Sequence, residues 1–188
     1  MKKEDKPMKK RALIAAALLV IVASPACTNK EGESEAPVFV TVDLPLQPLS
    51  SSASSGLPLT VQTMTLTSHL KNPTATDPQG FADVQINTYT VRFSRRDGGT
   101  RIPPPEQFSA AVLLPSGGSA TLNGFPIISA AALQQSPFDQ LLSFNGGVDR
   151  ETGLNEIHIF YSITFYGTTV SGHRVQSQTA TGDVFIVP

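Results

Sequence analysis

The chain has 188 residues, of which 14 are Lys or Arg, 15 are Asp or Glu, three are His, one is Cys and none is Trp. A net charge of −1 and a charged fraction of 15% exclude the basic surface of a nucleic-acid-binding protein, so we expect no nucleic-acid partner. A single Cys excludes an internal disulfide framework and any metal site that needs several cysteines.

The first 26 residues have the pattern of a secretory signal peptide. Residues 1–11 contain six basic and two acidic residues, and the twelve residues 12–23 are all apolar. Twelve helical residues rise about 18 Å, which is short of a hydrocarbon core of ~30 Å, so a cleaved signal is favoured over a permanent transmembrane helix. Ser24, Pro25 and Ala26 then supply the small residues of a cleavage site.

Cys27 follows this cleavage site directly, and the segment resembles the signal of bacterial lipoproteins. Ala26 matches the small residue before the lipidated Cys, whereas Ser24 and Pro25 depart from the usual leucine-plus-small pattern. The alternative, ordinary cleavage after Ala26, leaves a free N-terminal thiol in an oxidising compartment. The resemblance implies that Cys27 carries several acyl chains, palmitate among them, which attach the protein to a membrane of the bacterial cell envelope. Thr28 in place of Asp implies the outer membrane if the cell is Gram-negative.

Residues 28–36 are polar and have no apolar period, so we expect a flexible tether after the lipidated Cys. A flexible segment of this length spans roughly 15–18 Å. The predicted organisation is therefore a signal peptide at 1–26, Cys27 with its tether at 27–36, and one domain at 37–188.

Residues 37–188 show strand patterns and almost no helical period. In the clearest run, Ile157, Ile159 and Ile163 alternate with polar residues, which predicts a strand with one buried face. In the third run the alternation changes phase near Asn87 and Thr88, which predicts a β-bulge. The seven predicted strands cover Val38–Leu44, Leu59–Leu70, Val84–Ser94, Gln107–Leu114, Ser119–Ser129, Leu154–Tyr166 and Arg174–Val187.

Seven short strands separated by turn residues predict an all-β fold, and the spacing resembles that of a seven-stranded antiparallel sandwich of the immunoglobulin or fibronectin type III kind. The Cys pair and Trp of antibody domains are missing, and Tyr89 and Tyr161 are the candidates for the corresponding core positions. A barrel or jelly roll is the alternative. The one predicted helix covers Ser136–Leu142, with Ser as a cap and Pro at the first helical position.

In a sandwich of this order, the connections at 45–58, 95–106 and 130–153 lie at the end away from the tether, and they include the two longest connections of the domain. Binding sites are common in such loops. Arg92, Arg95, Arg96 and Arg101 are four of the seven positive charges in residues 37–188. Arg side chains recognise carboxylates and phosphates and are enriched at binding hot spots. An exposed hairpin whose charges deter edge pairing is the alternative. The predicted partner-binding residues at this end are Arg95, Arg96, Arg101, Phe138, Asp149 and Glu151.

Two patterns of reactive residues remain without a defined site. His69, His158 and His173 are far apart and have no Gly-x-Ser-x-Gly motif to join, so we expect surface or edge histidines and no catalytic residues. The acidic stretch 149–156 is rich in oxygen ligands but has no EF-hand spacing, so an exposed acidic turn is favoured and calcium binding stays open. No metal or cofactor is predicted.

The sequence therefore predicts a lipid-anchored protein of the cell envelope whose domain is a non-catalytic binding or structural module with an envelope protein as partner. The alternative is an adhesin-like or carbohydrate-binding module. Phe160 and Tyr166, on the polar face of the sixth predicted strand, are the aromatic residues that a glycan could contact.

Overall fold

The computed structural model describes residues 36–45 and 47–188. The predicted signal peptide, Cys27 and nearly all of the predicted tether lie outside the described residues. In the described part of the chain, no helix is both long enough and apolar enough to cross a membrane.

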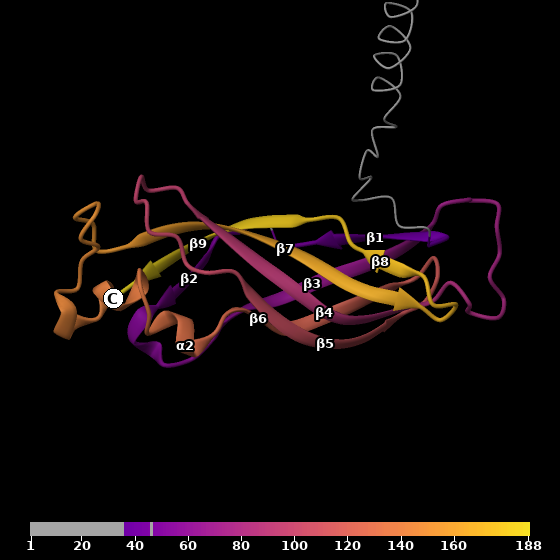
Figure 1. The fold of residues 1–188 in the computed structure, drawn as a ribbon, viewed down its shortest axis with the longest axis horizontal. Helices are drawn as coiled ribbons and strands as arrows, with labels where there is room; N and C mark the ends of the chain where they lie inside the picture. The colour runs from indigo at the N-terminus through magenta and orange to yellow at the C-terminus, as the bar shows by residue number, and fades with distance from the viewer. Residues whose placement is uncertain (1–35, 46) are drawn as a thin grey trace, which may run out of the picture. The chain divides into compact units, whose positions relative to one another are not determined.

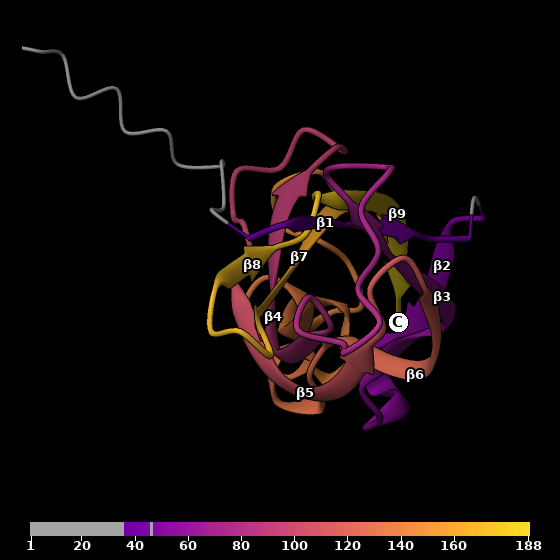
Figure 2. The same cartoon turned by 90° about the vertical axis from the view of Figure 1, so that its right-hand side faces the viewer.

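The described strands form two sheets (Figures 1 and 2). The all-β prediction is therefore confirmed. The smaller sheet has the order β1-β3-β6 and consists of β1 (Val38–Asp43), β3 (Leu59–Leu70) and β6 (Ser119–Ile128). The larger sheet has the order β2-β9-β7-β4-β5, with β8 also paired to β7. It consists of β2 (Leu49–Ser52), β9 (Ala180–Val187), β7 (Ile157–Thr169), β4 (Val84–Arg95), β5 (Glu106–Leu114) and β8 (Arg174–Gln176).

The core lies between the inner faces of the two sheets, as the alternation in β7 predicted. Ile157, Ile159, Ile163 and Phe165 are fully buried and Tyr161 is 2% exposed, whereas the residues between them are partly exposed. Period-two alternation places every second side chain on the same face, so one face of β7 is apolar and packs against the other sheet.

Tyr89 on β4 connects the two sheets through the core. Its ring contacts Phe108, Phe125 and Phe165 with centroid distances of 5.1 to 5.4 Å, and its hydroxyl donates to the carbonyl of Pro126, 2.7 Å away on β6. Burial raises the pKa of this phenol, which therefore stays protonated and keeps donating. The prediction that Tyr89 occupies the core is confirmed.

The predicted bulge in β4 is also confirmed. The register with both neighbouring strands shifts between Ile86 and Thr88. Asn87 is the additional residue relative to β7, whereas β5 has the additional residue in its pairing with β4. The shift keeps Val84 and Ile86 buried before it, and Tyr89 and Val91 buried after it.

Two strands differ from the prediction. The last predicted strand is divided into β8 and β9, because Ser177 forms a bridge to Val40 of β1 and Gln178 donates its N–H to the Val40 carbonyl. The strand β2 was not predicted, since Leu49–Ser52 is short and mostly polar, and it exists through parallel pairing with β9. The described residues thus contain nine strands rather than seven.

Short helical segments occupy the connection between β6 and β7. The predicted helix at Ser136–Leu142 is a 3₁₀ helix, η3 (Phe138–Leu141), without a side-chain cap. A second segment, α2 (Ala130–Leu133), was missed, and its N-terminus is capped by the Ser129 hydroxyl, which accepts from the Ala132 N–H. The 3₁₀ helix η4 (Ser143–Asn145) completes this connection, whereas the 3₁₀ helix η2 (Ala53–Ser55) lies between β2 and β3.

The predicted distribution of loops between the two ends of the domain is confirmed. At the end where residue 36 enters, the Lys71 N–H donates to Pro37 and the Val170 N–H donates to Asp83. At the opposite end, the Gln134 amide donates to the Ala53 carbonyl, and Arg95 contacts Asp149. We call the second end, formed by residues 44–45, 47–58, 95–105 and 129–156, the loop end.

Candidate functional site

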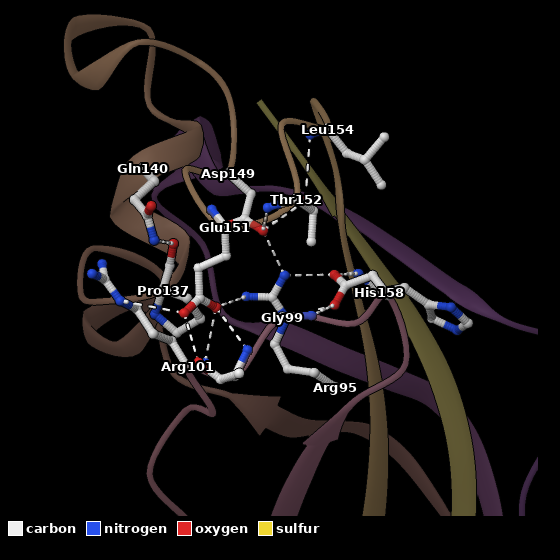
Figure 3. A network of polar contacts seen from close by, with 12 residues as sticks. Arg95, Gly99, Arg101, Pro137, Gln140, Asp149, Glu151, Thr152, Leu154 and His158 are labelled. Carbon is white, nitrogen blue, oxygen red and sulfur yellow. Dashed lines mark hydrogen bonds and ion pairs between the residues drawn. The ribbon is translucent and has the colours of Figure 1, made fainter.

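Arg95, predicted to be exposed, is buried at the loop end, where its side chain is 1% exposed (Figure 3). Its Nε and Nη2 donate to the two carboxylate oxygens of Asp97 at 2.8 and 2.7 Å. Nη2 also donates to Asp149 Oδ2 at 2.7 Å, and Nη1 lies 3.6 Å from Glu151 Oε2. We call Arg95, Asp97, Asp149 and Glu151 the Arg95 cluster.

Asp97 orients the guanidinium from the turn that ends β4. Its Oδ1 accepts from the Gly99 N–H at 3.1 Å, and its Oδ2 accepts from the His158 N–H on β7 at 2.9 Å. A Cβ at Gly99 would overlap the guanidinium of Arg95, so only glycine lets the charge lie against the backbone of this turn. Asp97 therefore joins the turn to β7 as well as to Arg95.

Asp149 brings the loop after η4 into the same cluster. Its side chain is fully buried, and its Oδ2 accepts from the Thr152 hydroxyl at 2.7 Å as well as from Arg95. The Glu151 N–H donates to Oδ1 at 3.3 Å, and the Asp149 N–H donates to the Leu154 carbonyl at 2.8 Å. The buried carboxylate and the backbone of Asp149 thus hold residues 149–154 in a compact turn.

Glu151 connects that loop to the turn after β4. Its carboxylate accepts from the backbone N–H groups of Thr100 and Arg101 at 2.8 and 3.0 Å and from the Thr100 hydroxyl at 2.7 Å. These hydrogen bonds place the chain at residues 100–101 against the loop at 149–152. Two loops that are about fifty residues apart in the sequence are therefore held together by one buried cation and its carboxylates.

The three carboxylates of the cluster stay ionised. Burial alone would raise the pKa of Asp97 and of Asp149, but the hydrogen bonds and charge of Arg95, together with backbone donors, bring both pKa values below the ordinary 3.8. Hydrogen bonds from the Arg101 N–H and the Thr100 hydroxyl lower the pKa of Glu151. For Arg95, burial opposes the charged form, and the bonds to Asp97 and Asp149 outweigh it and raise the pKa.

Three of the predicted partner-binding residues are not accessible, so this part of the prediction is corrected. Arg95 and Asp149 neutralise one another inside the protein, and Phe138 is fully buried in the core. Arg96 and Arg101 are exposed, with side chains 52% and 54% accessible, and Glu151 is partly exposed. A charged turn and a buried ionic cluster have the same residue pattern, and sequence alone does not separate them.

In the acidic stretch at 149–156, the carboxylates of Asp149 and Glu151 are used for contacts within the protein. The oxygens of Asp149 and Glu151 face donors, namely the guanidinium, hydroxyls and backbone N–H groups described above. The described residues contain no group of three or more His, Cys, Asp or Glu side chains that could hold a metal ion. The favoured expectation of an exposed acidic turn is wrong for Asp149, which is fully buried.

Arg96 and His158 form a second set of contacts on the outer face of the larger sheet. The Arg96 guanidinium lies over the Phe160 ring, 4.3 Å from its centroid, and 3.6 Å from Asp183. His158 Nε2 lies 3.0 Å from the same Asp183 carboxylate, and the His158 ring stacks on Phe185. Arg96 and His158 therefore share the Asp183 carboxylate, and the Arg96 guanidinium covers one face of the Phe160 ring.

Exposed apolar side chains lie in the same two connections as the Arg95 cluster, and they were not predicted from the sequence. Phe144 is 80% exposed, Ile102 is 53% exposed, Leu154 is 46% exposed and Val148 is 41% exposed. All four belong to the two loops that the Arg95 cluster joins. Their sequence signal was weak, because single apolar residues in loops are common.

Comparison of the sequence with known protein families found no matching family, and comparison with curated proteins found no matching protein.

Replacing Arg95 by Met should lower the free energy of unfolding by about 3–5 kcal/mol, because it leaves buried carboxylates without their cation. Replacing the exposed neighbour Arg96 by Met is the matched control and should cost under about 1 kcal/mol. Chemical denaturation followed by circular dichroism measures both. Equal stability of the two variants would show that the Arg95 cluster does not stabilise the fold.

The stability difference between the wild type and Arg95→Met should depend on pH. A carboxylate whose pKa is lowered by folding stabilises fully above its unfolded pKa, near 3.8 for Asp97 and Asp149, and loses that effect as the pH falls through the lower folded value. In the variant, burial without the guanidinium raises the pKa of these two carboxylates, so the difference should be largest near neutral pH and shrink as acid protonates them. Denaturation at constant salt across this range measures it, and a difference that stays constant in acid would contradict the assigned charges.

Proposed function

We propose that this chain is a lipid-anchored protein of the bacterial cell envelope whose domain is a non-catalytic module that binds an envelope protein through its loop end. The anchor is proposed from the lipoprotein-like sequence around Cys27. The binding role is proposed from the loop end, where a buried ionic cluster supports exposed apolar and arginine side chains.

The observation that carries the binding proposal is the position of Phe144, Ile102 and Leu154. These apolar side chains are 46–80% exposed and belong to loops joined through Arg95. Loops that are ordered before binding lose less conformational entropy on association, so the same contacts give higher affinity. Aromatic and arginine residues are enriched at protein interfaces, and Arg101 adds an exposed guanidinium beside Ile102.

We further propose that the domain is an immunoglobulin-like or fibronectin-type sandwich. The first, second and fifth predicted strands correspond to β1, β3 and β6, which form the smaller sheet. The third, fourth and sixth correspond to β4, β5 and β7, and the seventh contains β9. These four strands pair in the order β9-β7-β4-β5 in the larger sheet. In variable immunoglobulin domains, the additional C′ strand joins the sheet that contains strands C, F and G, and β5 has the corresponding position beside β4.

A non-catalytic role fits the use of the reactive groups. The carboxylates of Asp97, Asp149 and Glu151 accept hydrogen bonds from the chain itself. His69 lies 3.1 Å from the Thr41 hydroxyl and stacks on Phe39. The loop end lies opposite the end where residue 36 enters, so a lipid at Cys27 would leave it directed away from the membrane.

Replacing Cys27 by Ser should release the protein from membranes and abolish incorporation of radiolabelled palmitate. Two acyl signals give stable attachment, whereas a chain without lipid has no comparable affinity. Fractionation of cells that express the wild type or the variant, followed by autoradiography, measures both effects. A wild-type protein that incorporates no label would contradict the proposed anchor.

Replacing Phe144 and Arg101 together by Ser should remove a specific envelope protein from material copurified with the full chain. Leu113→Ser is the matched control, since Leu113 is 61% exposed on β5, outside the loop end. Quantitative mass spectrometry of the three purifications measures the loss, which should be at least about tenfold if both are hot-spot residues. Thermal unfolding verifies that the variants are folded. If the double variant and Leu113→Ser copurify the same proteins in the same amounts, the loop end is not the binding surface.

A further inference from the structure

A groove of about 670 Å³ lies away from the loop end, between the bulge of β4 and the β7–β8 hairpin. Ligand pockets in proteins commonly have volumes of about 300–1,000 Å³. The polar and aromatic side chains that line it are Asn87, Thr88, Tyr166, His173, Arg174 and Gln176.

Backbone geometry produces this groove. At the bulge, Asn87 is the additional residue of β4, and Gly167 of β7 lies so close to β4 that a Cβ there would overlap the Gln85 carbonyl. The short strand β8 then continues the sheet beside β7, with Gln176 paired to Tyr166 and Arg174 paired to Thr168. The lining residues therefore come from three adjacent strands and the turn that joins two of them.

The polar side chains of the groove have no hydrogen-bond partner within the described part of the chain. This holds for the side chains of Asn87, Tyr166, Arg174 and Gln176, in contrast to the Arg95 cluster, where each carboxylate accepts from several donors. Amide, phenol and guanidinium groups that gather in one hollow without internal partners are available to a ligand.

The chemistry of these groups favours a saccharide that carries negative charge. Tyr166 is half-buried and presents an aromatic ring, whereas the ring of Phe160, the other candidate aromatic, is covered by Arg96. Side-chain amides of Asn87 and Gln176 can donate to and accept from sugar hydroxyls. Arg174 is the charged residue of the lining, which contains neither Asp nor Glu, so an anionic group on the ligand meets a guanidinium and no carboxylate.

We propose that this groove binds an acidic oligosaccharide. Tyr166 packs against a sugar ring, Asn87 and Gln176 hydrogen-bond sugar hydroxyls, and Arg174 pairs with a carboxylate, sulfate or phosphate group of the ligand. The site is independent of the proposed lipid anchor and of the proposed protein partner, because it uses none of the loop-end residues.

The test uses the full chain, purified in detergent, on an array of immobilised oligosaccharides. The array pairs uronate-containing, sulfated and phosphorylated oligosaccharides with their uncharged parents. We expect binding to at least one acidic oligosaccharide, at least tenfold weaker binding to its uncharged parent, and no competition by the same concentration of inorganic phosphate or sulfate. An array without any acidic hit, or equal binding to acidic and uncharged members of a pair, would overturn the proposal.

Variants then test whether the binding uses the groove. Arg174→Gln and Tyr166→Ala should each weaken binding to the acidic oligosaccharide at least tenfold, measured by calorimetric titration. Arg92→Gln is the matched control, because Arg92 is an exposed arginine of β4 that does not line the groove. If Arg92→Gln and Arg174→Gln weaken binding equally, the interaction is a general charge attraction and the proposal is wrong. Unchanged circular dichroism spectra confirm that the variants are folded.

Discussion

The guanidinium of Arg95 must be neutralised inside the protein, and the arrangement of the loop end follows from that requirement. One buried cation faces the carboxylates of Asp97, Asp149 and Glu151. A single positive charge does not balance three negative charges, and backbone N–H groups provide the additional stabilisation. These donors come from the turn after β4, from β7 and from the loop at 149–152, so the charge balance is satisfied only when all three segments are in place.

As a result, the loop end and the groove use their polar side chains differently. At the loop end, the buried charged groups hold the loops together, and the exposed side chains include the apolar Phe144 and the arginines Arg96 and Arg101. In the groove beside the β4 bulge, the polar side chains have no internal role, and Arg174 and Tyr166 stay available. A protein contact at one end and a small polar ligand in the groove are therefore compatible within one domain.

The parts of the fold that could be predicted are those with a local physical cause. Period-two alternation in β7 predicted its buried face, and the change of phase in β4 predicted the bulge at Asn87. The strand β2 could not be predicted, because Leu49–Ser52 has no apolar alternation and depends on pairing with β9, more than 130 residues away. Division of the last strand likewise depends on the bridge between Ser177 and Val40.

The sequence by itself determined most of the strands, the inward-facing residues of the central strands and the concentration of arginine near the end of β4, since each is a property of neighbouring residues. The sequence also shows that Arg95 and Asp149 are ionisable residues, but it does not show whether their side chains are exposed or buried. Their burial was decided by the tertiary structure, because a charge is tolerated inside a protein only when its partners arrive from distant segments. The groove was decided in the same way, since β4, β7 and β8 form it only after they pair.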